Sequence, residues 1–154
     1  MSKILKLVQA SKLFGDQRND QSIVLVGGCF DILHVGHIDF LNNAKRLGDI
    51  LVVILEHDQN IKKKKGEGRP INTQKDRAQV LSHLQMVNFV ICLPQMKENN
   101  DYDRIVSLIK PHIIATTKGD PNIHHKKRVA KLVGAKLKIA NKLLKEYSSS
   151  KYLK

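Results

Sequence analysis

The segment Ile23–Asp49 constrains the fold of this chain more than any other part of its sequence. It opens with the continuous apolar run 23–26, which is typical of a strand buried in a parallel sheet. Gly27 and Gly28 follow, where the chain must turn sharply or let a ligand approach its backbone. A helical pattern then begins, with apolar residues at Ile38, Leu41, Ala44 and Leu47. A strand that passes through glycines into a helix gathers backbone N–H groups at the positive end of the helix dipole, and this arrangement binds phosphate.

Two histidines, His34 and His37, stand three residues apart where this helix starts. Their ring N–H groups are donors that can neutralise further negative charge on a bound phosphate. A zinc site is a weaker interpretation, because no cysteine or carboxylate pair stands nearby at ligand spacing to complete a four-coordinate geometry. A buried strand followed by a structural histidine pair is the alternative without a function. We therefore expect no metal ligands in this segment.

The residues from Gly28 to His37 carry the pattern Gly-x-Phe-Asp-x-x-His-x-Gly-His. This segment resembles the signature of the cytidylyltransferase-like nucleotidyltransferase superfamily, whose members place it between a strand and a helix. The resemblance implies that both histidines contact a nucleoside triphosphate and stabilise the pentavalent transition state. It also implies that Gly28, Cys29 and Phe30 present backbone N–H groups to the phosphates. Asp31 matches the aspartate of the family that orients a ligand or the loop, and capping of the turn is its alternative role.

A second match lies between Lys65 and Ala78, where Lys-Gly-Glu-Gly-Arg-Pro-Ile-Asn is followed by Asp-Arg-Ala. It resembles the corresponding loop and helix of bacterial heptose 1-phosphate adenylyltransferases, while the first signature equally allows a glycerol 3-phosphate cytidylyltransferase. The resemblance implies that a loop lysine, Lys62 or Lys65, and Arg77 grip the acceptor phosphate or the triphosphate. A guanidinium holds phosphate oxygens in bidentate fashion, which a lysine does not reproduce.

Two further matches lie in the C-terminal part of the chain. Gly119 and Asp120 resemble a Gly-Asp turn near the nucleotide base, although the flanking residues depart from the family pattern. Ser148, Ser149 and Ser150 resemble a closing segment that contacts phosphate at a helix N-terminus. The family often places an arginine shortly before this segment, and this chain has lysines there instead.

Strand patterns alternate with amphipathic helix patterns along the rest of the chain. The sequence predicts further strands at 50–55, 89–93, 112–116 and 137–140, and helices that begin near 73, 101 and 120. Residues 1–21 suggest a short amphipathic helix and a connector, and residues 59–72 suggest a long loop. We expect Val80, Leu81 and Leu84 to point inward. The whole pattern predicts one α/β, Rossmann-like domain over residues 1–154, with a five-stranded parallel sheet and helices on both faces.

The composition of the chain indicates the cellular compartment in which such a domain acts. The 154 residues and the 42% hydrophobic content suit a single core. No apolar run reaches the length of a membrane-spanning helix, and residues 1–10 lack the unbroken hydrophobic segment of a secretory signal. Cys29 and Cys92 do not form a disulfide framework, which favours a reducing compartment. We therefore expect a cytoplasmic protein without membrane contact.

The net charge of +13 attracts polyanions, so an RNA-associated nucleotide-binding module without catalysis is an alternative. Single-strand binders interleave stacking aromatics with positive charge, however, and the basic region 118–154 offers only Tyr147 and Tyr152. A dinucleotide-dependent oxidoreductase is disfavoured, because no Gly-x-Gly-x-x-Gly follows the first strand.

The main hypothesis is an enzyme that transfers a nucleoside monophosphate from ATP or CTP to a small phosphorylated acceptor, a sugar or polyol phosphate, with release of pyrophosphate. Such a transfer needs positioning and neutralisation of charge, and no activated serine or cysteine. We expect Mg²⁺ with the triphosphate, because the ion bridges phosphate oxygens and offsets their charge. Analogy with the family adds the expectation of a homodimer.

Overall fold

The computed structural model of the protein describes residues 2–15, 20–142, 150 and 153. Within these residues, six strands form one parallel sheet in the order β1-β4-β3-β2-β5-β6. The strands are β1 (Ile4–Leu5), β2 (Ile23–Gly28), β3 (Ile50–Leu55), β4 (Phe89–Cys92), β5 (Ile113–Lys118) and β6 (Lys136–Lys142). From β2 the chain builds the sheet outward through β3 and β4, and then returns to the other side of β2 with β5. The strand order therefore reverses between β2 and β5, where ligands of such sheets bind beyond the carboxyl ends.

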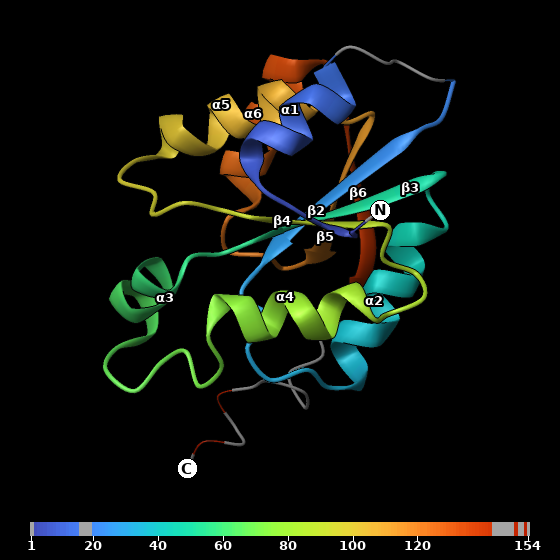
Figure 1. Cartoon of the computed structure of the whole chain (residues 1–154). Coiled ribbons are helices and arrows are strands. Elements are labelled where there is room, and N and C mark those ends of the chain that lie inside the picture. The colour runs from blue at the N-terminus through green and yellow to red at the C-terminus, as the bar shows by residue number, and fades with distance from the viewer. Residues whose placement is uncertain (1, 16–19, 143–149, 151–152, 154) are drawn as a thin grey trace.

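Helices cover both faces of the sheet (Figure 1). They are α1 (Leu7–Gly15), α2 (Val35–Lys45), α3 (Asp58–Lys65), α4 (Gln74–Ser82), α5 (Asn99–Ile109) and α6 (Ile123–Val133). Helices α1, α5 and α6 lie on one face, and α2 and α4 lie on the other. Helix α3 stands apart from both layers, beyond the end of β3 (Figure 1). The predicted α/β architecture with helices on both faces is confirmed.

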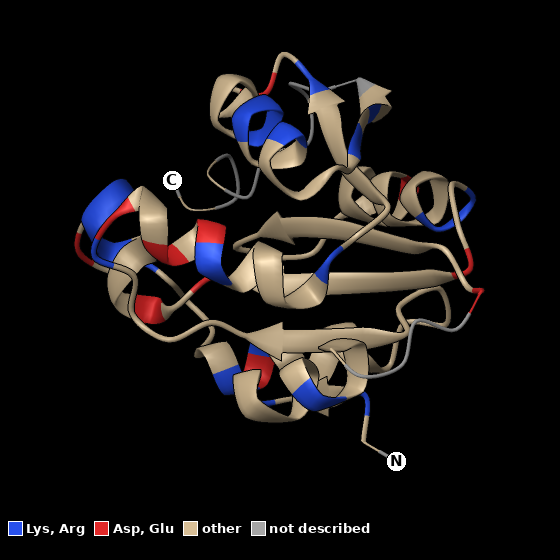
Figure 2. Cartoon of the chain, turned by 90° about the horizontal axis from the view of Figure 1, so that it is seen from above, with Lys and Arg blue, Asp and Glu red and all other residues tan. Residues whose placement is uncertain are grey.

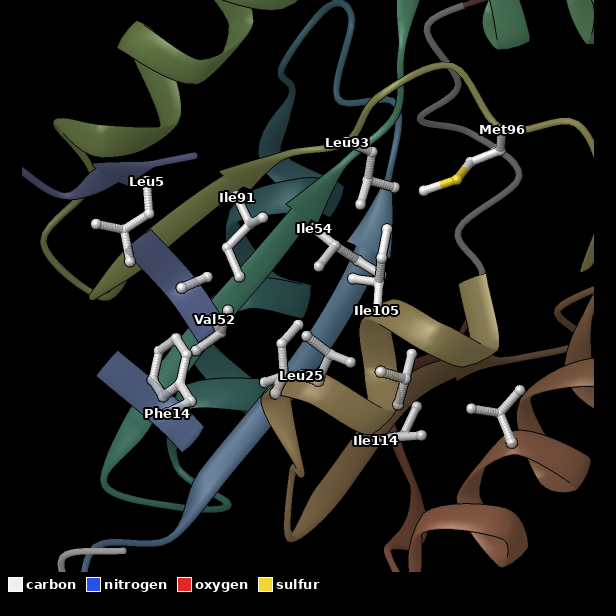
Figure 3. Close-up of a cluster of buried hydrophobic side chains, with 14 of the residues drawn as sticks. Leu5, Phe14, Leu25, Val52, Ile54, Ile91, Leu93, Met96, Ile105 and Ile114 are labelled. Carbon is white, nitrogen blue, oxygen red and sulfur yellow. The ribbon is translucent and has the colours of Figure 1, made fainter. Parts of the chain in front are cut away.

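The core consists of two clusters, because successive strand residues point to opposite faces. Leu25, Val52 and Ile91 pack under α1, α5 and α6, and Figure 3 shows these strand side chains in one cluster with Phe14 of α1 and Ile105 of α5. On the other face, Val24, Val26, Leu51, Val53 and Val90 pack against α2 and α4. Strands that are buried on both sides explain why the sequence reads as continuous apolar runs instead of alternating ones.

The prediction of five strands was wrong by one, since Ile4 and Leu5 form the edge strand β1. These two residues pair with Val90 and Ile91 of β4, and α1 begins only at Leu7. A strand of two residues carries no periodicity of its own. Its apolar side chains therefore merged with those of the following helix in the sequence pattern.

The prediction of a loop over 59–72 was also wrong in its first half, where α3 forms. The His57 side chain caps this helix by accepting a hydrogen bond from the backbone N–H of Gln59, 3.2 Å away. The four consecutive lysines occupy its last turn, where positive charge stabilises the helix dipole. Leu81 is buried as expected, but Val80, which was also expected to point inward, is 52% exposed. Ala78 and Leu81 are the buried apolar residues with which α4 covers the sheet.

Gly48 lies where the end of α2 meets the start of β2, and we expect Gly48→Ala to destabilise the protein. An added Cβ would stand 2.7 Å from Cγ2 of the buried Val24 and 3.0 Å from the backbone oxygen of Ser22. Neither a β-branched core side chain nor a strand backbone moves easily, so we expect a loss of about 1–3 kcal/mol. Urea unfolding measures the loss. Gly15→Ala is the matched control, because a Cβ there meets no atom of the described residues within 4 Å. Equal stability losses in the two variants would contradict the prediction.

Candidate functional site

The two signature histidines lie at the start of α2, beyond the carboxyl end of β2. His34 is the N-cap of this helix, in an extended backbone conformation, and its backbone N–H donates to Nδ1 of His37 at 3.3 Å. The two imidazole rings stack with centroids 3.9 Å apart and planes inclined by 25°. The helix start therefore fixes both rings relative to each other and to its first N–H groups.

This arrangement determines which nitrogen of His37 carries a proton. Nδ1 accepts a hydrogen bond, so a neutral ring holds its proton on Nε2. Burial, together with the charges of His34 and Lys65, lowers the pKa of His37 to about 4. Burial also lowers the pKa of His34. At neutral pH without ligand, His37 is thus an uncharged donor with a single N–H.

We expect His37 to titrate near pH 4 in the ligand-free protein, as followed by NMR of its ring protons. Because the native pKa lies below the unfolded value of 6.5, the unfolded chain takes up the proton first as the pH falls. The contribution of neutral His37 to stability is therefore complete above pH 6.5 and is lost as the pH falls towards 4. Added pyrophosphate should raise this pKa, since an anion beside the ring favours imidazolium. Titration near 6.5 without ligand would contradict the prediction.

The turn between β2 and α2 has an unusual backbone at Phe30, whose φ of 47° lies in the left-handed region. Its buried ring lies 5.4 Å from that of His37, between centroids, and so close to Gly28 that a Cβ there would meet it at 2.8 Å. Within the described residues, no hydrogen bond engages the backbone N–H of Cys29 or of Phe30. These groups are therefore free to serve a ligand, and their contact with phosphate stays a prediction.

Asp31 holds the segment 69–72 against this turn. Its carboxylate accepts hydrogen bonds from the backbone N–H groups of Ile71 and Asn72, at 2.8 and 2.9 Å, and forms an ion pair with Arg69 at 3.0 Å. Burial alone would raise the pKa of Asp31, but these hydrogen bonds and the Arg69 charge outweigh burial and lower it. Of the roles implied by the resemblance, the contacts favour orienting the loop over touching a phosphate.

Arg77 is fully buried and holds three loops together. Its guanidinium donates to the backbone oxygens of Cys29, Glu56 and Asn72 at 2.6, 2.9 and 3.0 Å. It also forms an ion pair with Asp58 at 2.6 Å. The grip on a phosphate stays a prediction, but four of the five guanidinium N–H groups serve protein acceptors. The contacts favour a positioning role for Arg77.

The lysines of α3 differ in the residues with which they interact. Lys65 acts electrostatically on both His37 and Cys29, whereas Lys62 pairs with Glu67 at 3.2 Å on the surface. Lys64 instead lies 3.5 Å from Glu56. Of the two lysines left open by the sequence, Lys65 is thus the one that the structure brings to the histidine pair.

The Gly-Asp turn follows β5, next to β2 at the point where the strand order reverses. Gly119 has a φ of 82°, which favours glycine. Asp120 accepts hydrogen bonds from the hydroxyl of buried Thr116 and from Lys126, and these contacts lower its pKa against the effect of burial. A contact with the nucleotide base stays a prediction. Ser148 and Ser149 lie outside the described residues, and Ser150 is described and exposed.

Several polar residues at this edge were missed by sequence reasoning. The Gln74 amide donates to the backbone oxygens of Leu55 and Leu93, which joins the ends of β3 and β4 to the start of α4. Asn60 exchanges two hydrogen bonds with the backbone of Met96, at 2.7 and 2.9 Å. Glu56 is buried although it is charged. The one signal in the sequence was that the charged residue Glu56 directly follows a buried strand. The hydrogen-bond partners of Gln74 and Asn60 lie far from them in the sequence, so no local pattern predicts these contacts.

Among the described residues, no group of three or more His, Cys, Asp or Glu side chains is arranged to hold a metal ion. None of the helices in the described part of the chain is long and apolar enough to cross a membrane.

Known proteins match this chain over the part that carries the candidate site. The Cytidylyltransferase-like family model matches residues 25–154. A Bifunctional protein HldE from Aliarcobacter butzleri is 46% identical over 94 residues, which cover 61% of this chain and 19% of that protein. The protein of the same name from Campylobacter fetus is 39% identical over 109 residues, which cover 71% of this chain and 23% of that protein. The chain thus spans about a fifth of the length of these relatives.

Solved structures show the same fold. A lipopolysaccharide core biosynthesis protein from Thermoplasma volcanium superposes with a TM-score of 0.64 at 30% identity, over 79% of this chain and 95% of that one. A pantoate-beta-alanine ligase from Francisella tularensis reaches a TM-score of 0.73 at 14% identity, over 100% of this chain and 74% of that one. The second likeness concerns the fold alone.

Proposed function

Because the chain belongs to the Cytidylyltransferase-like family, we propose that it transfers a nucleoside monophosphate from ATP or CTP to a small phosphorylated acceptor. The observation that carries this proposal is the pair of stacked imidazoles at the N-terminus of α2, next to unengaged backbone N–H groups of the preceding turn. This is a place for a chain of phosphates.

In the proposed reaction, an oxygen of the acceptor phosphate attacks the α-phosphorus of the nucleotide in line. A bond forms between this oxygen and the α-phosphorus, and the bond to the β-phosphate oxygen breaks, so that pyrophosphate leaves with the electron pair. Negative charge grows on the non-bridging and leaving oxygens. His37 donates a hydrogen bond from its Nε2–H to these oxygens. The positive end of α2 and the charge of Lys65 offset the negative charge that they carry.

We propose that Mg²⁺ enters with the nucleotide. The described residues of the phosphate-binding turn offer N–H donors and cations, whereas Mg²⁺ requires oxygen ligands, which the triphosphate and water supply. When bound there, the ion would withdraw charge from the phosphate oxygens.

For the acceptor we propose a sugar phosphate, with heptose 1-phosphate as the first candidate and glycerol 3-phosphate as the second. The resemblance of residues 65–78 supports the first, as does the solved relative whose name assigns it to lipopolysaccharide core biosynthesis. Release of pyrophosphate from ATP and CTP, measured across sugar 1-phosphates and glycerol 3-phosphate, tests the proposal. Absence of release with every pair would overturn it, and calorimetric titration with ATP and CTP identifies the preferred base.

The alternative of an RNA-associated module gains no support from the described part of the basic region. Lys136 and Lys138 are exposed on β6, the edge strand of the sheet, where lysines discourage pairing with other chains. Residues 118–142 contain no Phe, Tyr or Trp on which a base can stack. RNA binding that weakens steeply with salt, without pyrophosphate release, would favour the module. The homodimer stays a prediction, which sedimentation tests.

A further inference from the structure

A buried carboxylate that the proposed mechanism does not use lies directly beyond β3. The backbone of Glu56 is fixed by two hydrogen bonds, from its N–H to the oxygen of Gly28 at 3.1 Å and from Arg77 to its own oxygen at 2.9 Å. Its side chain is 8% exposed and accepts a hydrogen bond of 2.7 Å from the hydroxyl of Tyr102. Lys64 approaches the same carboxylate oxygen to 3.5 Å. Glu56, Tyr102 and Lys64 thus form one polar cluster, at which β3, α5 and α3 meet.

This cluster is adjacent to the phosphate-binding turn. The charges of Lys65, Glu56, Lys64 and Arg77 all act on the thiol of Cys29, the first residue after β2. Lys65 also acts on His37, and Glu56 and Cys29 both act on Tyr102. Contacts of the backbone agree, because Glu56 donates its N–H to Gly28 and Arg77 joins the backbone oxygens of Glu56 and Cys29. Figure 2 shows basic and acidic segments close together at the end of the sheet towards which the central arrows point.

We propose, building on the proposed function, that Glu56, Tyr102 and Lys64 form a subsite that binds hydroxyl groups of the acceptor. The acceptor phosphate then lies at Lys65, within reach of the histidine pair, and its carbon frame extends over α3 towards α5.

The chemistry of the cluster suits a hydroxylated ligand. Burial, followed by the hydrogen bond and charge of Glu56, raises the pKa of Tyr102, so its hydroxyl stays protonated and remains a donor. The Glu56 carboxylate has about four lone-pair sites, and within the described residues it accepts hydrogen bonds from Tyr102 and from the backbone N–H of His57, while Lys64 forms an ion pair with it. Lys64 has three N–H groups and a side chain that is 58% exposed. A sugar hydroxyl both donates and accepts, so it can donate to the carboxylate while it accepts from the ammonium group.

The charge balance points the same way. Lys64 offsets the charge of Glu56, so the cluster as a whole is close to neutral and does not itself attract a second phosphate. Further along the edge, Arg128 pairs with Asp103 at 2.9 Å and Lys126 pairs with Asp120. A neutral polar surface next to the cationic phosphate site fits an acceptor with an anionic end and a polyol end.

Two conservative variants test the subsite. Tyr102→Phe keeps the ring that packs against the core and removes only the hydroxyl, and Glu56→Gln keeps the shape of the side chain and removes its charge. We expect each to raise the KM for the sugar phosphate about tenfold and to leave the KM for the nucleotide within about twofold. Lys64→Ala should act in the same direction. Lys63→Ala is its matched control, because Lys63 is exposed on the same helix and forms no ion pair within the described residues.

Binding without turnover separates this inference from the proposed function. Calorimetry measures mannose 1-phosphate and inorganic phosphate binding to the wild type and the variants, in the presence of a non-hydrolysable ATP analogue. The inference expects the variants to lose sugar phosphate binding and to retain phosphate binding. Sugar phosphate binding that is equal in all variants, or absent in the wild type, overturns the subsite. Binding that depends on Glu56 and Tyr102 but is followed by no pyrophosphate release supports the subsite and overturns the transfer reaction.

Discussion

Replacing His37 with alanine is expected to lower kcat for pyrophosphate release by ~10²–10³-fold, and His34→Ala should have a similar effect. The reason is the geometry at the start of α2, where the His34 backbone N–H holds Nδ1 of His37 and leaves Nε2–H as the donor. Alanine at either position removes a donor that is oriented before the reaction and that no water replaces with the same alignment. Steady-state kinetics with saturating nucleotide measures the loss.

His83→Ala is the matched control for both variants, because His83 is exposed at the end of α4. It should leave kcat within about twofold, since surface changes away from a site have small effects. A decrease of only a few-fold for both His34→Ala and His37→Ala would remove the imidazoles from the chemistry. Circular dichroism of each variant ensures that the loss is not one of folding.

Arg77→Ala is expected to destabilise the protein by about 3–5 kcal/mol, because removal of one partner leaves the others buried without a donor. The variant leaves three backbone oxygens without the donor that now satisfies them, and the partly exposed Asp58 loses its ion pair. Arg77→Lys should lie in between, since one ammonium group does not reach acceptors on three loops. Urea unfolding gives the difference. Arg104→Ala is the control and should change stability by less than about 0.5 kcal/mol, because the Arg104 side chain is 76% exposed.

The same variants decide between the two roles considered for Arg77. A positioning role predicts that Arg77→Lys lowers stability and kcat together, because the turn at Cys29 loses its anchor. A direct grip on phosphate predicts instead a large loss of kcat in a protein of unchanged stability. The second result would contradict the role assigned by the contacts and restore the one implied by the sequence.

Local signals made much of this structure predictable. The run Ile50–Leu55 was predicted as a strand with the bounds that the structure has, because a β-branched segment between turns leaves few alternatives. The helix cap at Thr73 was equally accessible, since its hydroxyl bonds to a backbone N–H three residues on. The histidine signature located the candidate site for the same reason, as its residues are neighbours in sequence.

What escaped prediction depends on contacts between distant residues. Helix α3 has little apolar surface, and it is stabilised by Asn60 bonding to Met96 and by the burial of Ile61. Its lysines looked like a solvated loop because nothing in the local sequence reveals those partners. The buried contacts of Arg77 escaped prediction for a related reason. Three of its acceptors are backbone oxygens, which any residue supplies and which leave no trace in the amino-acid pattern.

The bond between Asn60 and Met96 has a consequence for how the chain tolerates changes of length. Both polar atoms of this amide exchange hydrogen bonds with one backbone position, so α3 and the segment before α5 keep a fixed spacing. Lys64 lies on α3, and Tyr102 lies on α5, which directly follows that segment. The distance between these two side chains therefore depends on the same spacing. An insertion in the exposed turn 66–68 should leave the distance between them unchanged, whereas a deletion of residue 97 or 98 shortens the connection from Met96 to α5 and should alter it.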